Sequence, residues 1–307
     1  MTGHVQSIGV VGTGMMGRGI AEATAVAGLR VTLVKATDGD VAKTREAMVA
    51  SLDKAVQKKK LDAGIRDMAL SQLFVTSDRD ALRSCELVVE SVVEDLEVKR
   101  ALFADLESRV AGDAVLATNT SSLRVGQVGG LLRRADRLLG LHFFSPVAAM
   151  KLVEIAPTRD TAPFAVEKAR GFVQLLGKTA VLVSDSSGYI VNRLLVPYLL
   201  DGIAALEAGL AGPTEIDTAM KLGCGHPMGP LALSDLIGLD VVYAMAKTLY
   251  SELHDRRYSP PALLRRLVLA SELGKKSGIG LYDYRTAEPT ANPRLRFILD
   301  ASEGISA

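Results

Sequence analysis

The sequence predicts an α/β domain with a mostly parallel sheet, an inserted helical hairpin, and an all-helical second domain. Three observations lead to this fold class. Short apolar strands alternate with helical segments up to residue 184, a glycine-rich turn follows the first strand, and no strand pattern recurs between Tyr189 and Gly280. Strands that are apolar throughout are typical of parallel sheets, because helices bury both faces. We place the domain boundary near residue 186, which gives domains of residues 1–186 and 187–307.

Short runs of aliphatic and β-branched residues mark the strands expected in the first domain. Such runs, bounded by glycine or polar residues, are typical of buried strands. The expected strands are residues 7–11, 31–34, 87–89, 114–117, 138–141, 151–155 and 179–183. Residues 18–27 have helical spacing between the first two strands, which predicts a strand–helix–strand unit with parallel strands.

A helical insertion interrupts this alternation at about residues 40–73. Residues 40–61 place Val41, Met48 and Leu52 on one side of a long amphipathic helix, and residues 65–73 form a second helix that returns to the sheet. We expect a helical hairpin. The far end of its first helix is basic, with Lys54, Lys58, Lys59 and Lys60.

The second domain reads as a series of helices. Residues 189–210 are apolar at helical spacing, with a kink expected at Pro197. Residues 214–217, Thr-Glu-Ile-Asp, resemble a capping box that opens the next helix. Residues 230–253 and 261–273 are expected to complete the helices of this domain.

The charge balance excludes several classes of protein. The 36 Lys and Arg residues against 35 Asp and Glu residues give a net charge of +1, and 48% of the residues are hydrophobic. A nucleic-acid binder usually has a basic excess, and a disordered chain has fewer apolar residues. The longest charge-free apolar run of interest, residues 138–150, is too short to span a membrane. We expect a cytoplasmic protein.

Neither the cysteines nor the histidines have the spacing of a metal site. Cys85 and Cys224 are too few for a disulfide framework and lie far apart in the sequence. His4, His226 and His254 show no ligand spacing either, and we expect no metal.

The glycine-rich turn predicts a dinucleotide-binding site. Residues 12–17, Gly-Thr-Gly-Met-Met-Gly, fit the G-x-G-x-x-G fingerprint of a Rossmann-type domain between a strand and a helix. The first glycine permits the tight turn, the second lets a pyrophosphate approach the backbone, and the third lets helix and strand pack closely. The expected cofactor-binding residues of this turn are Gly12, Gly14, Met15, Met16 and Gly17.

Lys35 stands where this fingerprint expects an acid. An acidic residue roughly 20 positions after the turn usually holds the ribose hydroxyls of NAD. A lysine cannot accept those hydrogen bonds, but its charge favours the 2′-phosphate of NADP. The alternative is that Lys35 faces solvent and that Asp38 or Asp40 replaces the missing acid. The choice between NAD and NADP therefore stays open.

Six further sequence blocks occur in a fixed order along the chain. They are Ala117-Thr-Asn-Thr-Ser-Ser122, Gly140-Leu-His-Phe-Phe-Ser-Pro146, Lys151-Leu-Val-Glu154, Tyr189-Ile-Val-Asn-Arg193, His226-Pro-Met-Gly-Pro230 and Gly274-Lys-Lys-Ser-Gly278. Together with the glycine turn, this set resembles the short-chain 3-hydroxyacyl-CoA dehydrogenase family, including the bacterial 3-hydroxybutyryl-CoA enzymes. The resemblance runs from about residue 5 to residue 284.

His142 and Glu154 are the expected catalytic pair. Oxidation of a secondary alcohol needs a base for the hydroxyl proton, and histidine has a suitable pKa near neutrality. A carboxylate that orients the imidazole and stabilises its charged form completes such a pair. His142 ends one expected strand and Glu154 lies on the next. Without the resemblance, a structural role is the better explanation for either residue: a satisfied core histidine and a glutamate at the end of a strand.

The resemblance implies roles for further residues. It assigns Ser121 and Asn192 to the substrate hydroxyl or carbonyl, and it places acyl-CoA binding along the hairpin, at Ser51 and Lys58. From the residues alone, the lysines are equally well a solvated helix end, and Thr120-Ser121-Ser122 is also a good helix cap. Asn119 and Glu94 are expected on the nicotinamide side, with Lys99 nearby.

The expected activity is hydride transfer between a nicotinamide cofactor and a 3-hydroxyacyl-CoA. The resemblance favours NAD and short acyl chains, and it implies a homodimer formed through the helical domain. Ser145 and Ser187 depart from the family pattern near the histidine and near the domain boundary. The alternatives are a dehydrogenase for carrier-bound or free hydroxy acids and a nucleotide-binding protein without catalysis.

Overall fold

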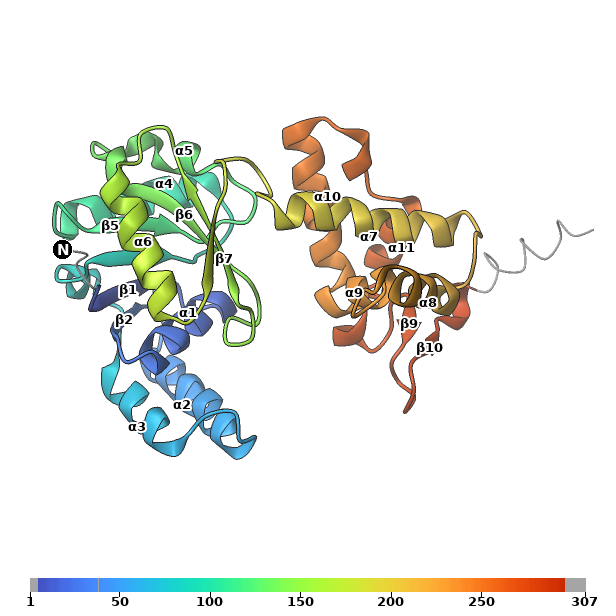
Figure 1. Ribbon diagram of the computed structural model, residues 1–307, viewed down its shortest axis with the longest axis horizontal. Coiled ribbons are helices and arrows are strands. Elements are labelled where there is room, and N and C mark those ends of the chain that lie inside the picture. The colour runs from blue at the N-terminus through green and yellow to red at the C-terminus, as the bar shows by residue number, and fades with distance from the viewer. Residues whose placement is uncertain (1–4, 38, 296–307) are drawn as a thin grey trace, which may run out of the picture. The chain divides into compact units, whose positions relative to one another are not determined.

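The structure, a computed structural model, describes residues 5–37 and 39–295. The chain forms two compact units, Met1–Tyr189 (unit 1) and Ile190–Ala307 (unit 2). Figure 1 shows the mixed helix and sheet structure of unit 1 and the mainly helical structure of unit 2. No helix among the described residues has both the length and the hydropathy needed to cross a membrane.

Unit 1 contains an eight-stranded sheet in the order β3-β2-β1-β4-β5-β6-β7-β8. All neighbouring strands pair in parallel except β6 and β7, which are antiparallel. The strands are β1 (Ser7–Val11), β2 (Arg30–Val34), β3 (Leu73–Thr76), β4 (Leu87–Glu90), β5 (Val115–Thr118), β6 (Leu138–Phe143), β7 (Leu152–Pro157) and β8 (Thr179–Leu182). The fold class expected from the sequence is confirmed.

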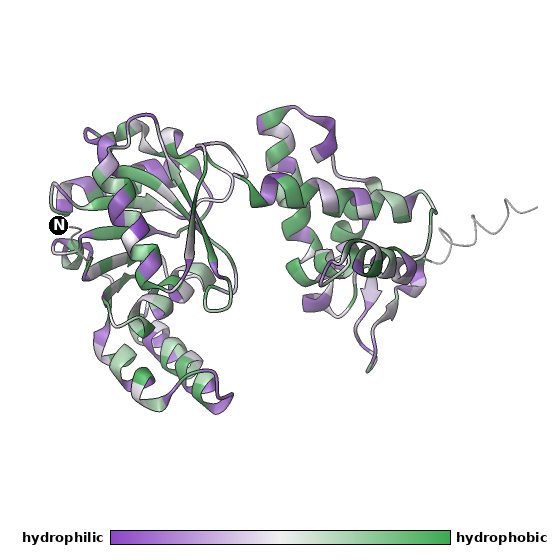
Figure 2. Cartoon of the chain, in the orientation of Figure 1, coloured by the Kyte–Doolittle hydropathy of each residue, from purple (hydrophilic) through white to green (hydrophobic). Residues whose placement is uncertain are grey.

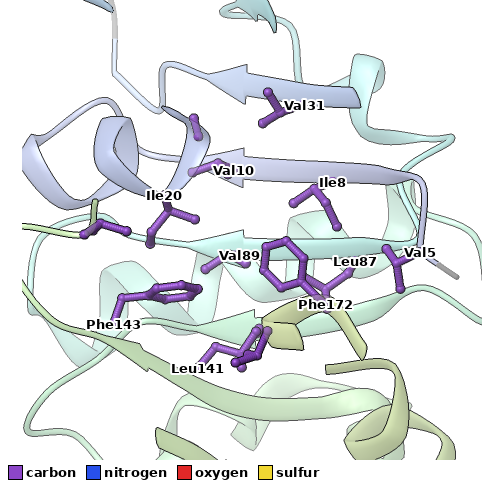
Figure 3. Packing of buried hydrophobic residues seen from close by; sticks show 14 of the residues in the cluster. Val5, Ile8, Val10, Ile20, Val31, Leu87, Val89, Leu141, Phe143 and Phe172 are labelled. Atoms are coloured by element: carbon purple, nitrogen blue, oxygen red, sulfur yellow. The ribbon is translucent and has the colours of Figure 1, made fainter. Parts of the chain in front are cut away.

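Helices cover both faces of this sheet because successive strand residues point to opposite sides. In β4, Leu87 and Val89 pack on the face covered by α1 (Met15–Val26) and α6 (Pro163–Leu175), as Figure 3 shows. Val88 packs on the other face, against α4 (Leu96–Arg109), near the short helix α5 (Val125–Val128). Figure 2 shows that the strands are mostly hydrophobic. Packing on both faces therefore makes the sheet rigid, and the loops that form the candidate site follow the carboxyl ends of its strands.

The helical insertion is a hairpin of α2 (Val41–Gln57) and α3 (Ala63–Gln72). Asp40 and Asp62 cap the two helices by accepting backbone N–H bonds. The first helix ends earlier than residue 61, since Lys59 has a positive φ of 54°. The second helix ends before Leu73, which begins edge strand β3; the sequence pattern missed this strand because Leu73 also fits helical spacing.

Unit 2 consists mainly of five helices among the described residues. They are α7 (Val191–Glu207), α8 (Pro213–Cys224), α9 (Pro230–Ile237), α10 (Leu239–Leu253) and α11 (Ala262–Leu269), followed by the short strands β9 (Tyr282–Asp283) and β10 (Thr290–Ala291). The single helix expected over residues 230–253 is two helices, since the chain turns at Gly238 with a φ of 104°. Pro197 lies inside α7.

The capping box expected at residues 214–217 is wrong. Helix α8 begins at Pro213, and no side chain caps it. The carboxylate of Asp217 instead accepts the backbone N–H groups of Leu231 and Ala232 at 2.8 and 2.9 Å, at the start of α9. It also accepts the Tyr282 hydroxyl at 2.8 Å. Asp217 thus joins three segments of unit 2.

Candidate active site

The glycine turn at the carboxyl end of β1 has the geometry of a pyrophosphate cradle. Gly12 has a φ of 116°, and a Cβ there would lie 2.1 Å from the carbonyl oxygen of Ser91. A Cβ on Gly17 would lie 1.9 Å from the carbonyl oxygen of Gly12, so strand and helix meet too closely for any side chain. A Cβ on Gly14 would meet nothing within 4 Å. Open space therefore lies beside the amino terminus of α1, where backbone N–H groups favour phosphate.

The two methionines of the turn differ in their surroundings. Met15 is 69% exposed at the start of α1, whereas Met16 packs partly against the hydrophobic core. The hydroxyl of Ser145, in the loop after β6, lies 3.9 Å from the sulfur of Met15. The loop after β6 therefore lies next to the glycine turn.

At the end of β2, Lys35 lies where the fingerprint expects an acid. Its Nζ donates to the hydroxyl of Thr37 at 3.1 Å. Asp40, one of the two residues considered as a replacement, accepts the N–H of Ala42 at 2.8 Å and caps α2. Asp38, the other, lies outside the described residues, as does His4.

His142 and Glu154 form a buried cross-strand pair. They lie directly opposite each other in the antiparallel register of β6 and β7. Nδ1 of His142 lies 2.7 Å from Oε2 of Glu154, and the two residues are 5% and 0% exposed. Alternation along the strands puts both side chains on the face opposite Leu141 and Val153. A histidine held this way has one ring nitrogen on a carboxylate and the other left for proton transfer.

Aromatic rings pack around this imidazole. The ring of Phe144 lies 4.5 Å and that of Tyr189 lies 5.3 Å from the His142 ring, centroid to centroid. Tyr189 is buried and has a positive φ of 45°, a backbone conformation that surrounding contacts must hold. Burial, together with the charges of Asp185, Glu94 and Glu154, raises the pKa of its hydroxyl. Sequence reasoning missed Tyr189 as part of this site.

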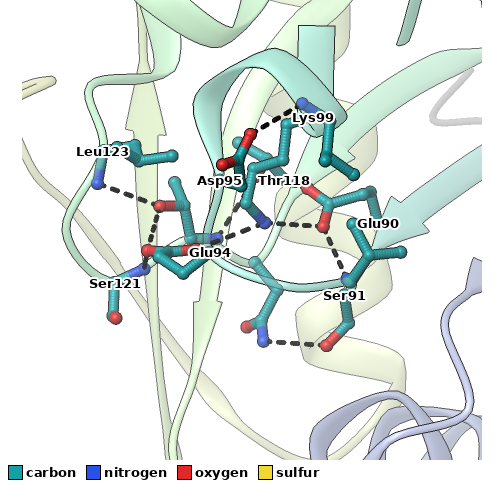
Figure 4. A network of polar contacts seen from close by, with 12 residues as sticks. Glu90, Ser91, Glu94, Asp95, Lys99, Thr118, Ser121 and Leu123 are labelled. Carbon is teal, nitrogen blue, oxygen red and sulfur yellow. Dashed lines mark hydrogen bonds and ion pairs between the residues drawn. The ribbon is translucent and has the colours of Figure 1, made fainter. Parts of the chain in front are cut away.

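The turn that contains Ser121 is held by one carboxylate. Oε1 of Glu94 accepts the Thr120 hydroxyl at 2.6 Å and the N–H groups of Ser121 and Ser122 at 3.0 and 3.1 Å. It also accepts the Ser122 hydroxyl at 2.8 Å. Figure 4 shows Glu94 beside Ser121. Although burial alone would raise it, the pKa of Glu94 is below its usual range because of Lys99 and these hydrogen bonds.

Asn119 joins the ends of three strands. Its Oδ1 accepts the N–H of Phe143 at 2.9 Å, and its Nδ2 donates to the Ser91 hydroxyl at 3.4 Å. The residue therefore connects the ends of β4, β5 and β6 next to His142. Both Oδ1 and Nδ2 of Asn119 take part in these hydrogen bonds.

Lys99, expected near the cofactor, lies beneath the surface. It is 1% exposed, and its Nζ lies 2.6 Å from Oε1 of Glu90 and 3.3 Å from Oε2 of Glu94. Glu90, at the end of β4, is completely buried and was not singled out in the sequence. The sequence feature that could have identified Glu90 is an acidic residue at the end of an otherwise apolar strand.

The remaining expected residues lie away from this network or in the other unit. The hydroxyl of Ser51 donates to Glu22 at 3.0 Å, and Lys58 is the exposed C-cap residue directly after α2. Burial raises the pKa of Glu22 despite the hydrogen bond from Ser51 and the charge of Arg18. Asn192 lies in unit 2, in the first turn of α7. The described residues contain no cluster of three or more metal-ligating side chains.

Comparison with known proteins decides the family. Residues 7–186 match the model of the "3-hydroxyacyl-CoA dehydrogenase, NAD binding domain", and residues 188–284 match its "C-terminal domain". The chain belongs to the 3-hydroxyacyl-CoA dehydrogenase family. It is an NAD-dependent oxidoreductase of fatty acid metabolism that acts on 3-hydroxyacyl-CoA.

Similar proteins with related names match this chain over nearly its whole length. A 3-hydroxybutyryl-CoA dehydrogenase of Mycobacterium tuberculosis is 45% identical over 286 residues, which cover 92% of this chain and 100% of the relative. The crystal structure of M. tuberculosis FadB2 has a TM-score of 0.88 at 45% identity, covering 91% of this chain and 99% of that one. The (S)-3-hydroxybutyryl-CoA dehydrogenase PaaH1 of Ralstonia eutropha has a TM-score of 0.86 at 38% identity, covering 92% and 100%.

Proposed function

We propose that this dehydrogenase interconverts short-chain 3-hydroxyacyl-CoA and 3-ketoacyl-CoA, with His142 as general acid and base. The observation that supports this most strongly is the 2.7 Å contact between Nδ1 of His142 and Oε2 of Glu154 in a buried pair. Because Nδ1 faces the carboxylate, Nε2 is the atom that exchanges a proton with substrate. Glu154 orients the ring and stabilises the imidazolium.

The two directions of the reaction use the same pair of residues. The bound nicotinamide accepts or supplies the hydride. In oxidation, His142 removes the proton of the 3-hydroxyl group as hydride leaves C3, and Glu154 stabilises the charge formed on the ring. In reduction, protonated His142 donates to the oxygen that becomes the 3-hydroxyl.

We assign Ser121 to the substrate hydroxyl or carbonyl, as the family resemblance implies. The turn from Thr120 to Ser122, bound to Glu94, supports this role because a fixed backbone orients the serine hydroxyl. Asn119 and Glu94 are assigned to the nicotinamide side of the same strand ends. Asn192 stays a prediction for substrate binding from unit 2.

The substrate proposal is a short acyl chain on coenzyme A. The names of the M. tuberculosis and R. eutropha relatives support 3-hydroxybutyryl-CoA, and the basic end of α2, with Lys58, supports a phosphate-bearing thioester. Oxidation of NADH would be followed with acetoacetyl-CoA, with longer 3-ketoacyl-CoA thioesters and with free acetoacetate. We expect acetoacetyl-CoA to give the highest kcat/KM and the free acid to fall by about 100-fold or more, because remote binding energy is lost. Equal activity on free acetoacetate would favour a hydroxy-acid dehydrogenase, and inactivity on every CoA thioester would favour a carrier-bound substrate.

We also propose that the enzyme accepts NADPH in addition to NADH, through Lys35. Lys35 follows β2 directly, and Asp40 is engaged in capping α2 rather than free to accept ribose hydroxyls. Replacement of Lys35 by Asp removes a cation and restores a hydroxyl acceptor. We expect Lys35→Asp to lower kcat/KM for NADPH relative to NADH by about 10- to 100-fold, the range of one charged hydrogen bond.

The control for this variant is Lys58→Ala, which removes a lysine far along the hairpin and is expected to leave the cofactor ratio unchanged. The NADPH proposal is wrong if the purified enzyme does not use NADPH, or if Lys35→Asp leaves the NADPH to NADH ratio as it is.

We propose a homodimer formed through unit 2, as the family resemblance implies. Large apolar side chains exposed on this unit support an interface, among them Leu194, Leu210, Leu222 and Leu269, each at least 67% exposed.

A further inference from the structure

Three charged side chains lie together beneath the strand ends of unit 1. Lys99 on α4 lies between Glu90 and Glu94, 2.6 Å from the first and 3.3 Å from the second. Figure 4 shows Lys99 with Glu90 and Glu94. The side chains of Glu90 and Lys99 are 0% and 1% exposed, whereas that of Glu94 is 36% exposed. A lysine this deeply buried is retained only where it is paired, because desolvation of an ammonium group is costly.

The inner carboxylate is fixed by contacts other than Lys99. Glu90 accepts the N–H of Val92 at 2.7 Å and the hydroxyl of Thr118 at 2.8 Å. These bonds connect the carboxyl ends of β4 and β5. Glu90 therefore holds the ammonium group of Lys99 at a fixed place under the loop that follows β4.

The outer carboxylate transmits this position to the Ser121 turn. Oε2 of Glu94 faces Lys99, and Oε1 accepts the four donors of residues 120–122. An ionised carboxylate accepts all of these bonds, whereas a protonated one has lost part of its acceptor capacity. The Thr120 hydroxyl, in turn, accepts the N–H of Leu123 at 3.0 Å.

We propose that Lys99 is a positioning residue, which keeps Glu94 ionised and thereby holds the backbone of Ser121 in place for substrate. The inference rests on the proposed role of Ser121. Lys99 does not touch substrate itself, since its ammonium group is buried between the carboxylates of Glu90 and Glu94. Loss of Lys99 leaves Glu94 beside Glu90 without the cation that offsets their repulsion.

The surroundings of Glu94 give this role a pH signature. The charged or titratable groups that face it are Lys99 from α4, Glu90 through that lysine, and the buried Tyr189. Lys99 and the hydrogen-bonded turn lower the pKa of Glu94, so the contacts persist above that pKa and are lost as the pH falls through it. Without Lys99 the loss occurs at higher pH. In general, a positive charge in contact with a carboxyl group lowers its pKa by about one unit or more.

The test is the pH profile of kcat/KM for acetoacetyl-CoA reduction by NADH. In this direction His142 donates a proton to substrate, a step that low pH does not impair, so a loss of activity at low pH reports on Glu94. We expect Glu90→Gln/Lys99→Met, which removes the buried pair together, to move the acid limb up by about one pH unit relative to Glu90→Gln. We expect Lys99→Met to do the same relative to the wild type.

Glu94→Gln changes a partly exposed residue. Its result can therefore be interpreted even if the variants at the buried residues do not fold. Because glutamine does not titrate here, we expect it to abolish this acid limb and to lower kcat/KM by about tenfold. Adding Lys99→Met to Glu94→Gln is expected to change kcat/KM by less than about threefold, since Lys99 acts through Glu94.

Two results would overturn the inference. One is a folded Glu90→Gln/Lys99→Met enzyme with the acid limb of Glu90→Gln. The other is Glu94→Gln with the wild-type profile. A wild-type enzyme inactive on every 3-ketoacyl-CoA would contradict the proposed function instead, and the two failures are therefore distinguishable.

Discussion

Replacement of His142 by glutamine is expected to lower kcat for acetoacetyl-CoA reduction by about 10² to 10⁴, the usual contribution of a general acid or base. Glutamine is close in size to histidine and keeps an N–H group that can donate to Glu154, but it cannot gain or lose a proton at neutral pH. The loss should therefore appear in kcat in both reaction directions. Steady-state rates of NADH oxidation with the purified variant give the measurement.

The control for His142→Gln is cofactor binding. Residues 7–186 match the NAD binding domain, and the expected pyrophosphate site is the glycine turn, which does not include His142. The dissociation constant for NADH, measured from its fluorescence, should therefore stay within about twofold. Near-normal turnover by a folded variant would show that another group transfers the proton.

Replacement of Glu154 by glutamine is expected to lower kcat by about 10² to 10³. The amide can still accept a hydrogen bond from Nδ1 of His142, which lies 2.7 Å from the carboxylate in the wild type. It carries no charge, however, and does not stabilise the imidazolium that forms in oxidation. Because Glu154 is completely buried, its effect on the ring is not screened by solvent.

The matched control for Glu154→Gln is Glu167→Gln, a carboxylate-to-amide change at an exposed position on α6 of the same unit. We expect this control to have wild-type kcat. If Glu154→Gln and Glu167→Gln are equally active, the carboxylate has no part in catalysis, and the buried pair is structural.

The His142–Glu154 pair illustrates how far sequence patterns reach. The strand runs and the motif blocks predicted that both residues lie on neighbouring strands. They did not determine that the strands are antiparallel with His142 opposite Glu154, because that register depends on the path of the loop between them. The geometry of the pair therefore comes from tertiary structure, although its members were predicted.

The buried Lys99 was beyond sequence reasoning for a different reason. Lysine is among the residues most rarely buried, so a lysine near the cofactor loops is expected at the surface. Its direction is set by the start of α4, where Asp95 accepts the N–H of Val98 and fixes the phase of the helix. Only that phase turns Lys99 toward Glu90.

Element boundaries were predictable where the local signal is strong. The glycine turn and the strands of the central sheet were expected, since glycine spacing and apolar runs are local properties. The Thr214–Asp217 capping box failed because Asp217 binds the start of another helix, a contact that only tertiary packing creates. Strand β3 was missed because its first residue, Leu73, also fits the spacing of the preceding helix, so the predicted helix ran on to Leu73 and the short strand was not recognised.

The central claim, that His142 and Glu154 act as one acid–base unit, is tested most directly by kcat for acetoacetyl-CoA reduction in a double-mutant cycle. Residues that act as a unit have non-additive effects. We predict that His142→Gln/Glu154→Gln has a kcat within about threefold of His142→Gln alone. A double variant whose loss equals the product of the two single losses would contradict the account, because each residue would then contribute independently.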